Sequence, residues 1–213
     1  MTKPRVLLAD DHRILAEGLR GLLEPEFEVV AVVTDGRELV AAAKRLRPDV
    51  IVADVAMPWL NGIEAAVQLR DAGARAKVVF LTMHRDVAYA RQAIEAGAAG
   101  FVLKHSAATE LVTAVREALR GQTYVTPMIA RELLESYREG GPRPPGSAHR
   151  LTARQREVLQ LFAEGRSAKE VAAVLNISPR TAEVHKARIL EALGLRSTAE
   201  LVQYAIRNGI ISV

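Results

Sequence analysis

Short apolar runs alternate with longer stretches of helical period through the first 125 residues of the chain. The runs cover residues 6–9, 29–33, 50–52, 78–81 and 101–103, and the helical stretches cover residues 13–23, 36–46, 63–72, 87–96 and 107–120. Each run is apolar at consecutive positions, so other parts of the chain should cover both faces of each strand. Alternation of strands and helices requires parallel strands joined by right-handed crossovers. The sequence therefore predicts an α/β domain with a doubly wound, parallel, five-stranded sheet.

A second region, in which every period is helical, follows residue 150. Gly165, Asn176 and Gly194 interrupt those periods, which is typical of a small all-α domain. Between the two regions, residues 140–147 alternate prolines with glycines and keep no apolar period, which favours a linker. We therefore divide the chain into a domain over residues 1–125, a linker over residues 126–150 with room for a helix before its proline-rich part, and a domain over residues 151–213.

The basic charge is concentrated in the last part of the chain. The whole chain has a formal net charge of +4. Residues 1–125 contain 16 basic and 16 acidic residues, whereas residues 151–213 contain nine basic against six acidic residues, a net charge of +3. An excess of this size in a short segment favours an anionic partner such as nucleic acid.

Composition excludes several classes of site. The 213 residues include no cysteine, which excludes disulfides, thiolate zinc sites and cysteine nucleophiles. With 49% hydrophobic residues, the chain can bury a full core. No segment approaches the roughly 20 apolar residues of a membrane span, and residues 1–8 contain too short an apolar run for a signal peptide. We expect a cytoplasmic protein with no membrane partner.

Polar side chains end four of the five predicted strands. Asp10 and Asp11 follow the first, Asp54 the third, Thr82 the fourth and Lys104 the fifth. Ligands of an open parallel sheet bind at the carboxyl ends of its strands. Three carboxylates in one crevice would repel one another unless a hard divalent cation such as Mg²⁺ joined them. Such a pocket allows an aspartate to accept a phosphoryl group, whose charge the cation and the lysine offset.

This pattern resembles the receiver domain of two-component response regulators, which has a flavodoxin-like fold. The resemblance covers about residues 1–125 and depends on Asp10-Asp11, on residues 54–58 followed by Asn61-Gly62, on Thr82, and on residues 97–104, which end in Lys104. It implies that Asp54 is the phosphoacceptor and that a histidine kinase is the partner that supplies the phosphoryl group.

The resemblance also assigns the other residues of the pocket. The Mg²⁺ site would consist of Asp10, which holds a metal-bound water, Asp11, Asp54 and the backbone carbonyl of Ala56. Thr82 and Lys104 would bind the phosphoryl group. Phe101 would be the aromatic switch, whose burial follows the movement of Thr82 toward the phosphate.

Each of these residues also has a plainer interpretation. Single aspartates after strands often cap helices, Thr82 suits any strand, and Lys104 could be a solvated loop residue. Phe101 could be an ordinary core ring at the end of a buried strand. Ala56 and His84 occupy the positions that tune the phosphoryl lifetime in this family, and together they leave that lifetime open.

The C-terminal region has the pattern of a helix-turn-helix. Thr152 is expected to cap the first helix without a capping box, because Glu157 lies too far along the chain. The second helix ends near Asn176, and Ser178 and Pro179 then start the third as its cap and its first residue. A short helix, a tight turn and a longer helix form the motif that places its last helix in the major groove of DNA.

The outer face of the third helix has an unusual mixture of residues. A projection at about 100° per residue places on this face or its flanks Arg180, Thr181, Glu183, Val184 and Arg188. In the major groove, Val184 can meet a thymine methyl group and Glu183 can accept from cytosine. Lys169, Thr181 and Arg188 suit contacts to phosphates. The charged residues could instead be merely solvated, with Val184 packed on a neighbouring subunit.

The segment over about residues 151–209 resembles the LuxR-type helix-turn-helix of the NarL/FixJ class of response regulators. The matching positions are residues 151–152, 156–159, 163–165, 169–172, 175, 177–178, 181, 184–185 and 193–194. The resemblance implies that Lys169, Thr181 and His185 contact the DNA backbone, although His185 could also cap the core. Ala182 and Ala187 depart from the family pattern, so the target sites of relatives cannot be transferred.

The last helix, over about residues 198–207, presents an apolar stripe. Part of the stripe must be core, and by resemblance Leu201 and Tyr204 would form a dimer contact. A twofold dimer should prefer double-stranded DNA with paired half-sites.

We therefore expect a transcriptional regulator that is controlled by phosphorylation, and no enzyme beyond a receiver that assists its own phosphotransfer and dephosphorylation. Three alternatives stay open. The chain could bind DNA independently of phosphorylation, or be an enzyme with an aspartyl-phosphate intermediate, although Ala56 stands where such enzymes usually have a second aspartate. A flavodoxin-type nucleotide module is disfavoured, because no glycine-rich phosphate loop follows the first strand.

Overall fold

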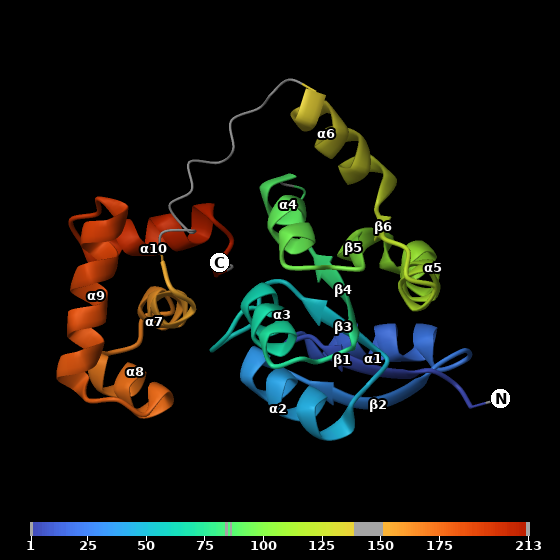
Figure 1. Cartoon of the computed structure of the whole chain (residues 1–213), viewed down its shortest axis with the longest axis horizontal. Coiled ribbons are helices and arrows are strands. Elements are labelled where there is room, and N and C mark those ends of the chain that lie inside the picture. Colours follow the sequence, from blue (N-terminus) through green and yellow to red (C-terminus); the bar gives the residue numbers. More distant parts are fainter. Residues whose placement is uncertain (1, 84, 86, 139–150, 212–213) are drawn as a thin grey trace. The chain divides into compact units, whose positions relative to one another are not determined.

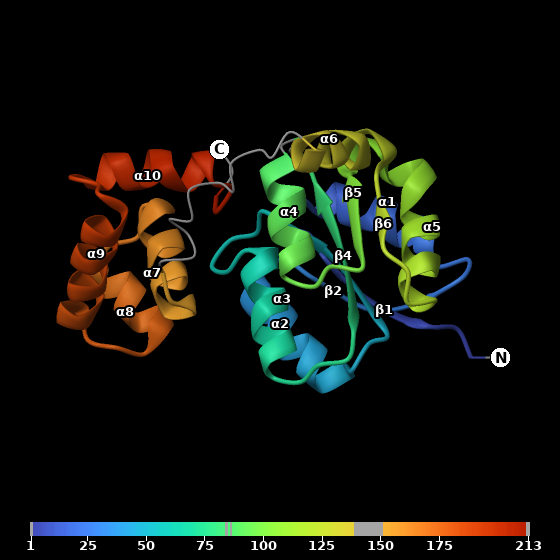
Figure 2. The ribbon, with the colours of Figure 1, turned by 45° about the horizontal axis from the view of Figure 1, so that its top comes forward.

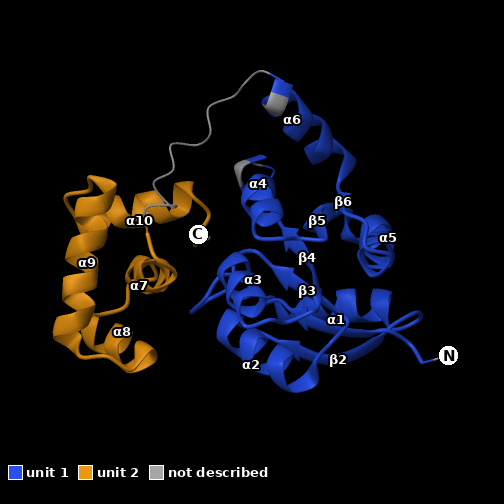
Figure 3. Ribbon diagram, viewed as in Figure 1, with its two compact units in different colours: residues 1–141 blue, residues 142–213 orange. Residues whose placement is uncertain are grey.

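The computed structural model describes residues 2–83, 85, 87–138 and 151–211. The chain divides into two compact units, Met1–Gly141 and Pro142–Val213 (Figure 3). The proline-rich segment 140–147 and His84 lie outside the described residues. No helix in the described part is both long and apolar enough to cross a membrane.

The N-terminal unit is a parallel sheet with helices on both faces (Figures 1 and 2). Its strands are β1 (Arg5–Ala9), β2 (Glu28–Val33), β3 (Val50–Asp54), β4 (Lys77–Thr82), β5 (Gly100–Leu103) and β6 (Tyr124–Val125). Its helices are α1 (Arg13–Leu23), α2 (Gly36–Leu46), α3 (Gly62–Asp71), α4 (Val87–Glu95), α5 (Ala107–Leu119) and α6 (Pro127–Arg138). The strand order is β2-β1-β3-β4-β5-β6, and every pair is parallel. The predicted α/β fold is confirmed.

Two apolar layers hold the helices on the sheet. One layer joins α2, α3 and α4 to the sheet through residues such as Leu39, Leu69 and Ala93. The other joins α1 and α5 through Leu19 and Leu111. The central strand β3 is buried along its whole length. Because both of its faces are covered, its sequence is a continuous apolar run and not an alternating pattern.

The sheet has one strand more than the sequence predicted. β6 pairs with β5, so that Tyr124 lies opposite Gly100 and Val125 opposite Phe101. A strand of two residues is too short to produce a detectable period. The helix α6 follows at once and buries Ile129 completely in the apolar layer that also contains α4. The segment after residue 125 therefore begins as part of the N-terminal unit.

Two glycines allow the chain to approach itself closely beside the carboxyl end of β3. A Cβ atom on Gly62 would lie 2.1 Å from the backbone oxygen of Asp54, and one on Gly36 would lie 1.9 Å from the backbone oxygen of Leu60. A larger residue at either position would force the backbone to shift. Asn61 accepts a hydrogen bond that caps α3. Together these contacts fix the loop that follows Asp54.

The described part of the C-terminal unit consists of α7 (Ala153–Ala163), α8 (Ala168–Leu175), α9 (Pro179–Leu193) and α10 (Thr198–Arg207). Ser178 caps α9 and Pro179 takes its first position, as predicted. Thr152 caps α7, but the expectation that it does so without a capping box is wrong, because Gln155 supplies the reciprocal contact. The partner in a capping box stands three residues after the cap, which is the position of Gln155 and not of Glu157.

The turn between α8 and α9 has its own conformational signal. Asn176 ends α8 in the left-handed conformation, with φ of 52°, which asparagine tolerates better than most residues. Val171 and Leu175 of α8 and Ala182 and Ile189 of α9 are buried, so the two helices share one core. The predicted helix-turn-helix is therefore present in this unit.

Candidate functional site

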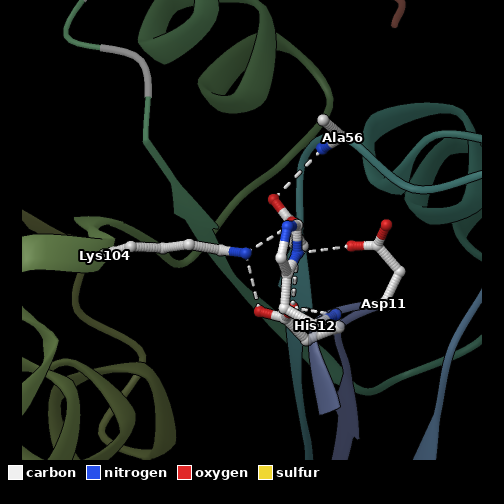
Figure 4. A network of polar contacts seen from close by, with 6 residues as sticks. Asp11, His12, Ala56 and Lys104 are labelled. Atoms are coloured by element: carbon white, nitrogen blue, oxygen red, sulfur yellow. Dashed lines mark hydrogen bonds and ion pairs between the residues drawn. The ribbon is translucent and has the colours of Figure 1, made fainter. Parts of the chain in front are cut away.

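Carboxylates from two strand ends converge at the carboxyl edge of the sheet (Figure 4). Asp10 follows β1 and Asp54 ends β3. Asp10 is fully buried, and Asp54 is 4% exposed. Asp11 and His12 belong to the loop after β1. Ligand atoms of all four side chains lie within 4.8 Å of one another. The structure thus brings the three predicted acidic residues together.

Lys104 reaches the same pocket from the end of β5. Its Nζ atom lies 2.6 Å from Oδ2 of Asp54 and 2.8 Å from Oδ2 of Asp10 (Figure 4). Burial lowers the pKa of Lys104, but the two carboxylates outweigh burial, so the pKa lies above its usual value. The side chain is therefore an ammonium ion that partly offsets the charge of both aspartates.

The carboxyl group of Asp54 is less acidic than usual. Burial raises the pKa of Asp54 to about 6, although the ammonium group of Lys104 favours the charged form. The N–H of Ala56 donates to Oδ1 at 3.1 Å and acts in the same direction as Lys104, whereas Asp10 adds to the rise by repulsion. The protein alone thus compensates the charge of Asp54 incompletely, which is a common feature of functional sites.

The donor atoms in this pocket fit a hard divalent cation. Asp10, Asp11 and Asp54 offer carboxylate oxygens at one place, and Lys104 contributes one positive charge against their three negative charges. Mg²⁺ prefers a few carboxylate oxygens together with waters and phosphate oxygens. The residues that would hold the ion are these three aspartates and, through its backbone carbonyl, Ala56.

Thr82 and Phe101 lie on neighbouring strands at this edge. Thr82 ends β4 opposite Leu103, the residue before Lys104. It is almost fully buried, and it lies at the same edge of the sheet as the lysine. The ring of Phe101 is fully buried in the apolar layer that contains α4, and Phe101 lies opposite Phe80. In this structure the ring belongs to the core, and its movement as a switch stays a prediction.

His12 is a residue of this pocket that was not predicted from the sequence. Its backbone N–H donates to Oδ1 of Asp10 at 2.9 Å, and its side-chain Nδ1 atom lies 2.8 Å from Oδ1 of Asp11 (Figure 4). The histidine therefore contacts both aspartates of the loop after β1. A histidine that directly follows two aspartates at a strand end was the signal that could have identified it.

The residues predicted to contact DNA are exposed, with one exception. The exposed residues are Lys169 of α8 and Arg180, Thr181, Glu183, Val184 and Arg188 of α9. Val184 is 43% exposed although it is apolar. His185 is half-buried, and its buried Nδ1 atom has no hydrogen-bond partner among the described residues. Thr181 has its hydroxyl 2.8 Å from that of Ser178, so its side chain also takes part in the cap of α9.

The assignment of Leu201 to a dimer contact is wrong. Leu201 is fully buried inside the C-terminal unit, so it belongs to the core and has no surface to offer a second subunit. Tyr204 is half-buried, and Ile206 of the same helix is 37% exposed. The apolar stripe of α10 is therefore used partly within the unit, and its outer edge carries Ile206.

Comparisons with known proteins identify both units. Residues 6–116 match the response regulator receiver domain, and residues 149–205 match the bacterial regulatory proteins of the luxR family. The transcriptional regulatory protein DegU of Brevibacillus brevis is 34% identical over 99% of this chain and 96% of its own length. The RcsB response regulator of Salmonella typhimurium has a solved structure with a TM-score of 0.65 and 29% identity, which covers 96% of this chain and 97% of that chain.

A further solved structure is that of a complex between RcsB and DNA. It matches with a TM-score of 0.59 and 27% identity over 95% of this chain and 98% of that chain. Both matched families are found in the order receiver, then LuxR-type domain, and the relatives span nearly the whole chain. The chain belongs to the two-component response regulators, in the NarL/FixJ class that joins a receiver domain to a LuxR-type helix-turn-helix.

Proposed function

We propose that phosphorylation of Asp54 controls the binding of this transcriptional regulator to promoter DNA. A histidine kinase supplies the phosphoryl group, Mg²⁺ is the cofactor, and the phosphorylated chain binds paired half-sites as a homodimer. The observation that carries the proposal is the pocket in which Asp54, buried and with its pKa raised to about 6, lies 2.6 Å from Lys104 and beside two further aspartates. The proposed partners, a kinase and DNA, require a cytoplasmic location.

Asp54 is the nucleophile of the proposed transfer. A carboxylate oxygen of Asp54 forms a bond to phosphorus while the bond from phosphorus to the nitrogen of the kinase histidine breaks, and that nitrogen keeps the electron pair. Because its pKa is about 6, Asp54 is largely ionised at pH 7 and needs no separate base. When bound, Mg²⁺ supplies positive charge to the phosphoryl oxygens and the carboxylates.

Lys104 and Thr82 bind the transferred group. The ammonium of Lys104 exchanges its contact with Oδ2 of Asp54 for a contact with a phosphoryl oxygen. The hydroxyl of Thr82, at the end of β4, donates to another phosphoryl oxygen. Such new contacts change the output only if they favour one state of a two-state element, for which the neighbouring Phe101 is the candidate.

The exposed face of α9 is the proposed DNA-reading surface. The matched structure of a complex between RcsB and DNA supports a DNA partner. Arg180 and Arg188 flank Val184 on this face, and the second helix of such a motif lies in the major groove. Glu183 and Val184 are the residues suited to base edges, and Lys169 is suited to a phosphate.

The proposal can be tested by DNA binding with and without beryllofluoride plus Mg²⁺, a phosphoryl mimic. Genomic DNA fragments are titrated with the wild-type chain and with Asp54→Asn at several salt concentrations. We expect the mimic to increase the affinity of the wild type and to leave the variant unchanged. Each phosphate contact should steepen the dependence of log affinity on log salt by about 0.9.

Each other outcome points to a different function. If Asp54→Asn responds to the mimic as the wild type does, the mechanism is wrong. Equal DNA affinity with and without the mimic would indicate a regulator that is independent of phosphorylation. Turnover of small phosphate esters would indicate an aspartyl-phosphate enzyme, although Ala56 offers no second carboxylate for that chemistry.

A further inference from the structure

Thr126 is a buried residue outside the pocket that is bonded to the strand from which Lys104 emerges. Its hydroxyl oxygen accepts from the N–H of Leu103 at 3.2 Å, and its O–H donates to Oε2 of Glu110, on α5, at 2.6 Å. Its own N–H donates to the backbone oxygen of Phe101 at 3.0 Å. The residue is only 3% exposed. One buried side chain thus joins the end of β5, the start of α6 and the helix α5.

The hydroxyl of Thr126 takes the place of a backbone carbonyl as the acceptor for the end of β5. The paired residues of the ladder between β5 and β6 end at Val125, and beyond them the N–H of Thr126 still donates to the backbone oxygen of Phe101. The backbone oxygen of Thr126, the next acceptor along the ladder, instead accepts from the N–H of Ala130 at the start of α6. A buried N–H without a partner is costly. By accepting from Leu103, the hydroxyl keeps β5 regular up to the residue before Lys104.

The position of Thr126 in the sequence predicts a different use. A threonine directly before a helix that starts with proline ordinarily caps that helix with its side chain. The backbone oxygen of Thr126 does accept from the N–H of Ala130 at 3.0 Å, as expected at a helix start. Its hydroxyl, however, is used by β5 and α5. This use connects α6 directly to the strand that carries the phosphoryl-binding lysine.

We infer that Thr126 is a positioning residue for Lys104 in the phosphoryl reaction, an inference that rests on the function proposed for Asp54. Lys104 follows Leu103 directly, so the N–H held by Thr126 fixes the main chain from which the ammonium reaches Asp10 and Asp54. During transfer the ammonium must leave Asp54 for a phosphoryl oxygen. That exchange is fast only if the main chain of Lys104 stays in place, because a misplaced binding group loses rate.

Three variants separate positioning from a general effect on folding. Thr126→Val removes the hydroxyl and keeps the volume, and Thr126→Ser keeps the hydroxyl. Thr123→Val makes the same change at an exposed position in the segment before β6 and is the matched control. Phosphoryl uptake from phosphoramidate is followed by intact mass spectrometry, and Mg²⁺ affinity is measured by calorimetric titration.

The expected result is a loss of rate without a loss of metal binding. Thr126→Val should slow phosphoryl uptake about tenfold, the effect of one lost hydrogen bond, and leave Mg²⁺ affinity unchanged. Thr126→Ser and Thr123→Val should both behave as the wild type. If Thr126→Val fails to fold, Thr126→Cys, whose thiol is a weaker acceptor, should fold and show an intermediate rate.

A double-mutant cycle tests whether Thr126 acts through Lys104. In a Lys104→Met background, Thr126→Val should cause little further loss of uptake, because the group that it positions is gone. An equal further loss in that background overturns the inference, as does a folded Thr126→Val or Thr126→Cys variant with the rate of the wild type. Failure of the wild type itself to take up a phosphoryl group would contradict the proposed function of Asp54 instead.

Discussion

The Nζ atom of Lys104 lies 2.6 Å from Oδ2 of Asp54, and both side chains are almost completely buried. This contact joins the residue proposed to receive the phosphoryl group to a residue proposed to bind it. Burial nevertheless raises the pKa of Asp54 to about 6. The ion pair therefore recovers only part of what burial of the carboxylate costs, and the pocket favours any ligand that adds positive charge.

The raised pKa of Asp54 predicts a pH-dependent gain in stability for Asp54→Asn in the absence of Mg²⁺. The folded-state pKa of about 6 lies above the ordinary value of 3.8, so the native state binds the proton more tightly than the unfolded state. The contribution of Asp54 to stability therefore falls as the pH rises from about 4 to about 6. Each pKa unit corresponds to about 1.4 kcal/mol. We expect Asp54→Asn to raise the free energy of unfolding of the N-terminal unit at pH 7.5.

Urea denaturation in a chelating buffer at several pH values measures this effect. The difference between Asp54→Asn and the wild type should be largest above pH 6 and shrink toward pH 4, where the wild-type carboxyl group is protonated in the native state. A gain that stays constant down to pH 4 would show that the substitution acts through packing and not through charge.

Lys104→Met should destabilise the unit and strengthen its binding of Mg²⁺. The substitution leaves two buried carboxylates without their ammonium partner, and removal of one partner from a buried ion pair costs about 3 kcal/mol. A cation that no longer competes with the lysine should bind more tightly. Urea denaturation and calorimetric titration measure the two effects. Lys44→Met, on the exposed side of α2, is the control and should change neither quantity.

Gly62→Ala should destabilise the unit by about 3 kcal/mol, the upper range for overpacking, because the new Cβ atom would lie 2.1 Å from the backbone oxygen of Asp54. Gly18→Ala is the matched control. An added Cβ atom at Gly18, inside α1, meets nothing within 4 Å, and alanine in a helix is about 0.5–1 kcal/mol more stable than glycine. The midpoint temperature of thermal denaturation should therefore fall for Gly62→Ala and rise for Gly18→Ala. Shifts of the same sign would contradict the close approach of Gly62 to the backbone of Asp54.

Val184→Ala and Lys169→Ala should weaken DNA binding in different ways. Loss of the valine should reduce the preference for thymine at one position and leave the salt dependence unchanged. Loss of the lysine should weaken all sequences alike and reduce the salt slope by about 0.9. Lys44→Ala, in the N-terminal unit, is the control for the lost charge. If Val184→Ala keeps the full sequence preference, the valine does not read a base.

The sheet and the acidic pocket could be predicted because two independent patterns agree. Continuous apolar runs identify buried parallel strands, and polar residues that end them must gather at one edge. Thr126 and His12 could not be assigned in the same way. The hydroxyl of Thr126 is hydrogen-bonded to Leu103, which is distant in sequence. His12 stands one residue beyond the two aspartates that follow the first strand, and it contacts Asp11. Neither relationship leaves a period in the sequence.

The C-terminal unit shows where helical periodicity becomes ambiguous. The exposure of Val184 was predicted correctly, because its helix has few apolar residues and its inner face is easily identified. Leu201 belongs to a helix with a broader apolar stripe, and its periodicity does not distinguish residues buried within one unit from those available to a second. Only the packing of α10 shows that Leu201 is core.

The burial of Ile129 determines where the chain can be truncated without exposing the core of the N-terminal unit. Besides this apolar contact, Nη2 of Arg91, on α4, donates to the hydroxyl of Ser136, on α6, at 2.6 Å. A truncated chain that stops at residue 125 would uncover the apolar surface beneath α6 and should aggregate. A chain that stops at residue 138 keeps this surface covered. A shortened chain made to crystallise the N-terminal unit or to screen it for inhibitors should therefore retain α6.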